Sequence, residues 1–119
     1  MWIKTLKDCQ GFIAGDGCTL KEYFHPEKQP LKVRYSLAHA VVSPREITRP
    51  HVLSTSEVYF ILRGEGVMHI GEEEKTVTTC DVIYIPPGEV QHIENKSDIP
   101  LEFLCIVDPP WRKENEEIL

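Results

Sequence analysis

The sequence has no apolar run of about 18 residues, the length that a membrane-spanning helix needs. Its first eight residues mix lysine and aspartate with the apolar side chains, so the apolar centre of a secretory signal peptide is also missing. We therefore expect a cytoplasmic protein that has no membrane partner.

Positive charge is scarce as well. The chain has 13 lysine and arginine residues against 19 aspartate and glutamate residues, which gives a formal net charge of −6. A surface that follows the phosphates of nucleic acid needs clustered positive charge, so we expect no nucleic-acid partner.

The four cysteines lack CxxC spacing, and a reducing compartment disfavours disulfides. Cysteine chemistry is therefore not expected to carry the function.

Helical periodicity is weak, and what the chain has instead is a series of short β-type segments between turn residues. The nine prolines and seven glycines interrupt any long helix. Strands are predicted at residues 33–42, 57–62, 67–70, 76–79, 82–85, 90–95 and 101–107. This spacing predicts an all-β antiparallel sandwich or barrel. The acidic tail, residues 111–119, is the clearest candidate for a short helix.

Two segments place polar side chains beside a turn that glycine or proline enforces. The first contains His51 and Glu57 and ends at the turn of Gly64. The second begins at the turn of residues 86–88 and continues to Asn95. Polar groups that gather at strand ends around one cavity are typical of a ligand or active site.

The two segments resemble the two sequence motifs of the cupin superfamily. The first motif has two histidines separated by one residue, then a glutamate and a glycine. Here His51, Glu57 and Gly64 match that motif, while Leu53 stands where the second histidine would be. The resemblance implies that Glu57 and His51 are the catalytic or ligand-binding pair of the cavity.

The second motif of that superfamily has Pro-x-Gly, then a histidine and an asparagine. Pro86, Gly88 and Asn95 match, and Gln91 takes the position of the histidine. The resemblance spans about residues 33–107. It implies a jelly-roll barrel, or double-stranded β-helix, in a single domain of residues 1–119 with a short C-terminal tail. It also implies a homodimer, consistent with the apolar residues on both faces of the strand predicted at 33–42.

A divalent metal is the cofactor that the resemblance implies, held by two histidines, the glutamate and the later histidine. Of these positions, His51 and Glu57 are kept, and Gln91 could contribute an amide oxygen. Amide and carboxylate oxygens suit Mg²⁺, Mn²⁺ or Ca²⁺, whereas an imidazole favours iron, nickel or zinc. The identity of the metal therefore stays open.

Two further histidines are candidate metal ligands. Strand alternation that directs Ile93 into the core also directs Gln91 inward and His92 outward. A one-residue bulge after Gly88 would reverse this and make His92 a ligand. His39 either forms hydrogen bonds in the core or at an interface, or supplies the missing imidazole from a neighbouring strand.

These observations leave two function classes open. In the first, the barrel is a metal-dependent enzyme of isomerase, dioxygenase, decarboxylase or cyclase type that acts on a small molecule, with Glu57 or His51 moving a proton. In the second, it binds a sugar or other polar metabolite without turning it over, and the metal site is degenerate. Whether His39 or His92 faces Glu57 is the feature that separates the two.

Overall fold

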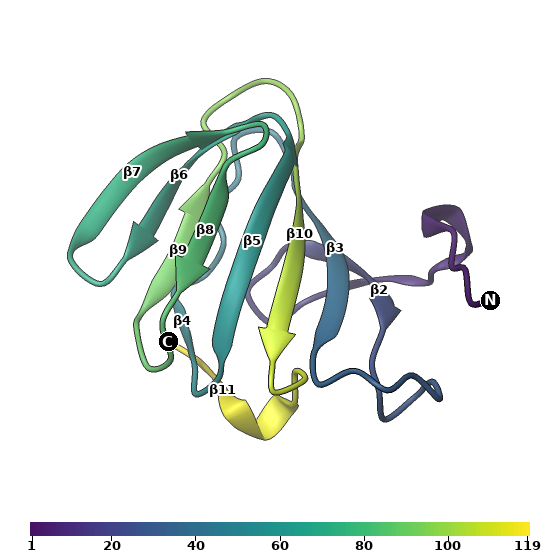
Figure 1. Ribbon diagram of the computed structural model, residues 1–119. Coiled ribbons are helices and arrows are strands. Elements are labelled where there is room, and N and C mark those ends of the chain that lie inside the picture. The colour runs from purple at the N-terminus through teal and green to yellow at the C-terminus, as the bar shows by residue number, and fades with distance from the viewer.

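The computed structural model describes residues 1–119 and is built almost entirely of strands (Figure 1). The strands are β1 (Gly11–Ile13), β2 (Thr19–Phe24), β3 (Ser36–Val42), β4 (His51–Leu53), β5 (Ser56–Arg63), β6 (Glu65–Ile70), β7 (Glu73–Thr78), β8 (Val82–Ile85), β9 (Gln91–Glu94), β10 (Leu101–Asp108) and β11 (Glu116–Ile118). Two single-turn 3₁₀ helices, η1 (Leu6–Asp8) and η2 (Lys113–Asn115), are also present. The all-β prediction is confirmed.

The strands form two antiparallel sheets that face each other across one interior. The six-stranded sheet has the order β1-β2-β3-β10-β5-β8, and the five-stranded sheet has the order β11-β4-β9-β6-β7. Several neighbouring strands are distant in sequence, such as β3 and β10 or β4 and β9, as in a jelly roll. None of the helices is long and apolar enough to cross a membrane.

Strict alternation along the strands directs one set of side chains into this interior. On β5 the inward residues are Glu57, Tyr59 and Ile61, and on β10 buried residues alternate with half-buried ones along the strand. The far end of the interior is closed by apolar side chains such as Ile61, Leu101 and Phe103, each at most 1% exposed. The near end, where Glu57 lies, is polar.

The turn between β5 and β6 explains the glycine of the first motif. Gly64 has a φ of +91°, and a Cβ at this position would lie 2.7 Å from the carbonyl oxygen of Pro100. A side chain there would both strain the backbone and collide with it, so only glycine fits.

The acidic tail does not form the short helix that the sequence suggested. Residues 113–115 make one 3₁₀ turn, and β11 then pairs with β4 in register, Ile118 opposite His51 and Glu116 opposite Leu53. The physical reason is the short strand β4, which pairs with β9 at a single residue pair and gains its second neighbour from the tail. The tail thereby fixes the strand that carries His51.

Candidate functional site

A cavity of about 260 Å³ opens at the polar end of the space between the two sheets. Its walls are mainly apolar, and the polar side chains that reach it include those of His51 and Glu57. The structure therefore brings together the two residues that the first motif singles out. Asp16, Ser36, Tyr59 and Glu116 also line this cavity.

Glu57 is the cavity carboxylic acid whose pKa is perturbed. Its side chain projects inward from β5 and is only 6% exposed, and this burial raises its pKa from 4.5 to about 8. The negative charges of Asp16 and Glu116 raise the pKa further, while a hydrogen bond from Gln91 opposes the shift. At neutral pH Glu57 is therefore a neutral carboxylic acid, which can donate a proton.

Gln91 connects the two sheets behind Glu57. Its Nε2 donates to Glu57 Oε1 at 3.0 Å, and its Oε1 accepts the hydroxyl of Tyr59 at 3.1 Å. Gln91 comes from β9, whereas Glu57 and Tyr59 come from β5 of the opposite sheet. All three side chains are buried, so this bridge fixes the orientation of the Glu57 carboxyl group.

The ring of His51 is oriented by a hydrogen bond to the backbone carbonyl two residues before it. Its Nδ1 lies 2.9 Å from the carbonyl oxygen of Arg49, which can only accept a hydrogen bond, so Nδ1 carries the proton. In the neutral ring Nε2 then has a free lone pair, and it lies 4.0 Å from Asp16 Oδ2. Asp16 is held in turn by the backbone N–H of Cys18, which donates to Oδ1 at 3.1 Å.

The side chains at the metal position of the cupin motifs do not fit a divalent metal. Leu53 is buried and has no donor atom. The amide oxygen of Gln91 already accepts the Tyr59 hydroxyl, and its nitrogen faces Glu57. Only His51 and Glu57 remain, fewer than the three protein ligands of a catalytic zinc site.

His39 does not join this group. Alternation along β3 directs Ser36 and residue 38 into the cavity, so His39 lies on the opposite face of the strand. Its Nε2 is 3.2 Å from Glu102 Oε1 there, and the side chain is buried. His39 is therefore a paired histidine of the outer face of the six-stranded sheet.

His92 also lies away from the cavity, and no bulge reverses the register of β9. Gln91 and Ile93 are each 1% exposed, while His92 is half-buried on the outer face. Its ring stacks on His69 with centroids 4.1 Å apart. Partial burial and the neighbouring His69 lower the pKa of His92. The two histidines and Glu94 form a separate cluster, with ligand atoms within 4.8 Å of one another.

Sequence reasoning missed the acidic residues that complete the cavity. Asp16 precedes Gly17, and an Asp-Gly pair is typical of a surface turn, yet Asp16 is 8% exposed. Glu116 belongs to the acidic tail, whose charges look like solvated surface. Neither carries a local signal of its role, because each reaches the cavity through contacts with distant residues: Asp16 O accepts the backbone N–H of Arg49, and Glu116 pairs with Leu53.

Comparison with known proteins agrees with this geometry. The chain is 40% identical over 119 residues to the uncharacterized protein MJ1618 of Methanocaldococcus jannaschii, covering 98% of this chain and 94% of that protein. A Streptomyces PAC13 variant solved with uridine superimposes with a TM-score of 0.79 at 18% identity, covering 100% of this chain and 91% of the other. A predicted oxalate decarboxylase of Thermotoga maritima gives a TM-score of 0.78 at 23% identity, over 91% and 99% of the two chains.

The family model described as "Cupin domain" matches residues 38–107, which is more than half of the chain. That range contains both motifs, from His51 to Asn95, together with the central strands of each sheet. The chain therefore belongs to the cupin family.

Proposed function

We propose that the cavity binds a small polar metabolite and that His51 and Glu57 transfer protons on it without a metal. The observation that carries the proposal is that one cavity holds a group that can accept a proton, His51, and a group that can donate one, Glu57. His51 offers a lone pair at Nε2, and burial keeps Glu57 protonated with a pKa of about 8. A base and an acid that face one cavity are the components of general acid–base catalysis.

Elimination of water is the reaction class that would use both groups. His51 Nε2 would take a proton from a carbon of the substrate, and the electron pair of that bond would form a double bond. Glu57 would give its proton to the departing hydroxyl, which leaves as water. The proton on His51 then returns to Glu57 through solvent, and the site is restored. One of the structural relatives, PAC13, is described as a nucleoside dehydratase.

The cavity favours a ligand of modest size that has both apolar and polar parts. A volume of about 260 Å³ accommodates a small metabolite, and the apolar walls include Phe12, Leu20 and Phe103. The polar groups gather at one side, around Glu57. A ligand with a hydroxyl or carbonyl oxygen would place that oxygen at the Glu57 proton.

Thermal-shift binding of uridine, oxalate and a panel of hydroxy acids and nucleosides tests the proposal. A ligand at 100 times its Kd stabilises the folded state by about 2.7 kcal/mol, which raises the Tm by several degrees. We expect His51→Ala to raise the Kd of the best ligand by at least about tenfold, because one ligand contact is removed. The rise in Tm at a given ligand concentration should be smaller accordingly. Glu117→Gln, an exposed change on β11, serves as the matched control.

Two outcomes separate the function classes. Turnover of the bound compound that disappears in both His51→Ala and Glu57→Gln supports the enzyme. Tight binding without turnover in the wild-type protein favours the alternative, a binding module, which the outward positions of His39 and His92 also favour. Binding that both variants leave unchanged would refute the proposed site.

We propose in addition that the protein is a homodimer that packs through the outer face of its six-stranded sheet. Around the paired His39 and Glu102, this face carries apolar side chains on β3, β5, β8 and β10: Leu37, Val41, Val58, Phe60, Val82, Tyr84, Leu104 and Ile106. Val82 and Tyr84 are 63% and 60% exposed, and the other six are half-buried. Apolar surface that gathers on one face in this way supports a protein interface. Beyond the edge of the same sheet, the first residues of the chain extend away from the barrel with Trp2 and Ile3 exposed (Figure 1).

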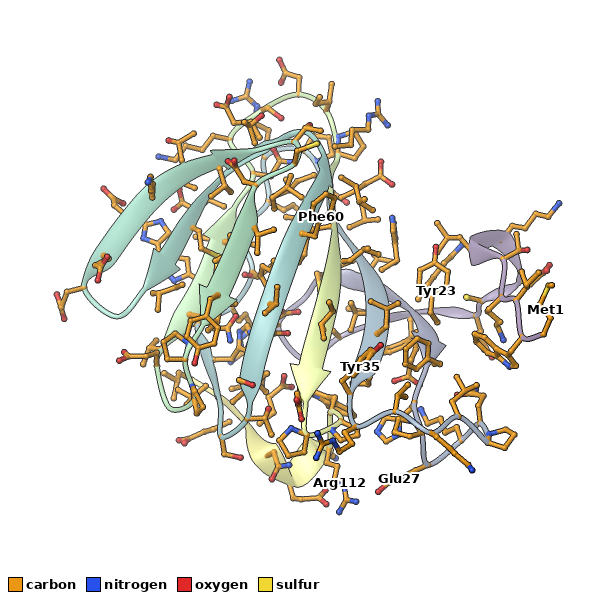
Figure 2. All side chains as sticks on the ribbon, in the orientation of Figure 1. Met1, Tyr23, Glu27, Tyr35, Phe60 and Arg112 are labelled. Carbon is orange, nitrogen blue, oxygen red and sulfur yellow. The ribbon has the colours of Figure 1, made fainter.

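Phe60→Glu is expected to convert this dimer into a monomer. Phe60 lies on β5, a central strand of the sheet (Figure 2), so the substitution would bury a carboxylate in the interface. Light scattering after gel filtration measures the change as a halving of the mass. Thr76→Glu on the exposed strand β7 is the control. A wild-type protein that is monomeric at all concentrations would contradict the proposal.

A further inference from the structure

The outer face of the five-stranded sheet carries the cluster of His69, His92 and Glu94, which is separate from the cavity. His69 on β6 lies directly opposite His92 on β9 in the strand register. Glu94 follows His92 by two residues, so both project from the same face of β9. Three potential ligands are thus held by two strands that pair through backbone hydrogen bonds.

Glu74 orients the central histidine of this cluster. It lies opposite His69 on the other neighbouring strand, β7, and its Oε2 is 3.5 Å from His69 Nδ1. This contact favours the ring form that carries its proton on Nδ1, so that Nε2 has a free lone pair. A carboxylate that accepts from the second nitrogen of a histidine is the usual support of a metal-ligating imidazole.

The free nitrogen of His69 has no hydrogen-bond partner. Nε2 is buried and unpaired, and the nearest carboxylate oxygen, Glu94 Oε1, is 4.0 Å away, beyond hydrogen-bond distance. The other oxygen of Glu94 pairs with Lys96 at 3.4 Å, which leaves Oε1 directed toward His69. A buried polar atom without a partner needs a physical explanation, and a bound ion is one.

We propose that His69, His92 and Glu94 form a binding site for a zinc-class divalent cation on the outer face of the five-stranded sheet. Two imidazoles and one carboxylate are a common zinc ligand set, in which the fourth position is open to water or a ligand. The ligand atoms lie within 4.8 Å of one another, and a turn of the stacked His69 and His92 rings would direct all three to one ion. The cation would satisfy His69 Nε2 and cross-link β6 to β9.

Calorimetric titration with Zn²⁺ tests this site in protein freed of metal by chelator and dialysis. All samples carry Cys80→Ser, because the exposed thiol of Cys80 is another zinc ligand. We expect one ion per chain, and we expect His92→Gln and Glu94→Gln each to lower the affinity by at least about tenfold, because the loss of a residue that only supports a metal ligand already costs about 10- to 100-fold. Glu74→Gln, a change at the positioning residue, is expected to weaken binding by about tenfold.

Two further variants separate this site from the cavity. His51→Ala should keep the full affinity for zinc, and Glu65→Gln, an exposed change on β6, should also keep it. The Tm of the Cys80→Ser parent protein should rise with Zn²⁺ concentration, and that rise should disappear when His92→Gln is added. Circular dichroism without metal checks that each variant is folded. The proposal is overturned if the Cys80→Ser parent shows no saturable binding, if His92→Gln binds as tightly, or if His51→Ala abolishes binding.

Discussion

Asn95→Ala is expected to lower the free energy of unfolding by about 3 kcal/mol, because it removes the hydrogen-bond donor that joins the end of β3 to the loop before β10. Asn95 Nδ2 donates to the carbonyl oxygens of Val42, Ser43 and Ile99 at 3.0, 3.3 and 2.8 Å. Its Oδ1 accepts from both the backbone N–H and the hydroxyl of Ser97. The side chain is 1% exposed, so water cannot replace these bonds without entering the core.

Urea denaturation of the variant against the wild-type protein measures this loss. Lys96→Ala changes the next residue, whose side chain is exposed, and should alter stability by no more than about 0.5 kcal/mol. A loss below about 1 kcal/mol for Asn95→Ala would mean that water or a shifted loop satisfies the three carbonyls. The asparagine of the second cupin motif would then have another role than holding the loop after β9.

Much of the fold was accessible from the sequence because strand alternation and turn residues act locally. Val82–Ile85 occupies β8 as predicted. The strand predicted at 57–62 is one residue shorter than β5 at each end, and the strand predicted at 101–107 ends one residue before β10. The outward position of His92 also followed from alternation, since Ile93 had to be buried.

The strands that the sequence did not predict depend on contacts with distant strands. β2 mixes lysine and glutamate with apolar residues and is half-buried along its whole length. β4 and β11 have three residues each, too few for a periodic signal, and they stabilise each other by pairing although they are distant in sequence. Asp16 enters the cavity by the same kind of long-range placement.

The cavity also shows why motif positions alone did not determine its chemistry. In the motif, Gln91 stands in for a metal ligand, but its amide is used to join Glu57 to Tyr59. An amide offers a donor and an acceptor at once, which a metal-ligating imidazole does not. The replacement therefore uses Glu57 in a buried hydrogen-bond bridge, and burial keeps its carboxyl group protonated against the hydrogen bond that Gln91 donates.

Glu57→Gln is expected to stabilise the protein, and the gain is expected to grow with pH. The folded protein holds the Glu57 proton up to a pKa of about 8, whereas an unfolded chain releases it near 4.5. Between these values the folded state binds more protons than the unfolded state, so the stability of the wild-type protein falls as the pH rises. Glutamine cannot ionise, keeps an oxygen for Gln91 Nε2, and avoids this loss.

Below pH 4.5 the ionisation of Glu57 should make no difference between the free energies of unfolding of the two proteins. By pH 8 the free energy of unfolding of the variant should be higher by about 4 kcal/mol. Denaturation of both proteins at a series of pH values from 5 to 9 measures the difference, in which the titrations of all other groups cancel. Glu117→Gln, on exposed β11, should show no such dependence. A difference that stays constant with pH would mean that Glu57 ionises normally in the folded protein, and the proposed acid would be lost. A stabilised variant that no longer turns over its ligand would instead identify the protonated Glu57 as a group kept for function at the cost of stability.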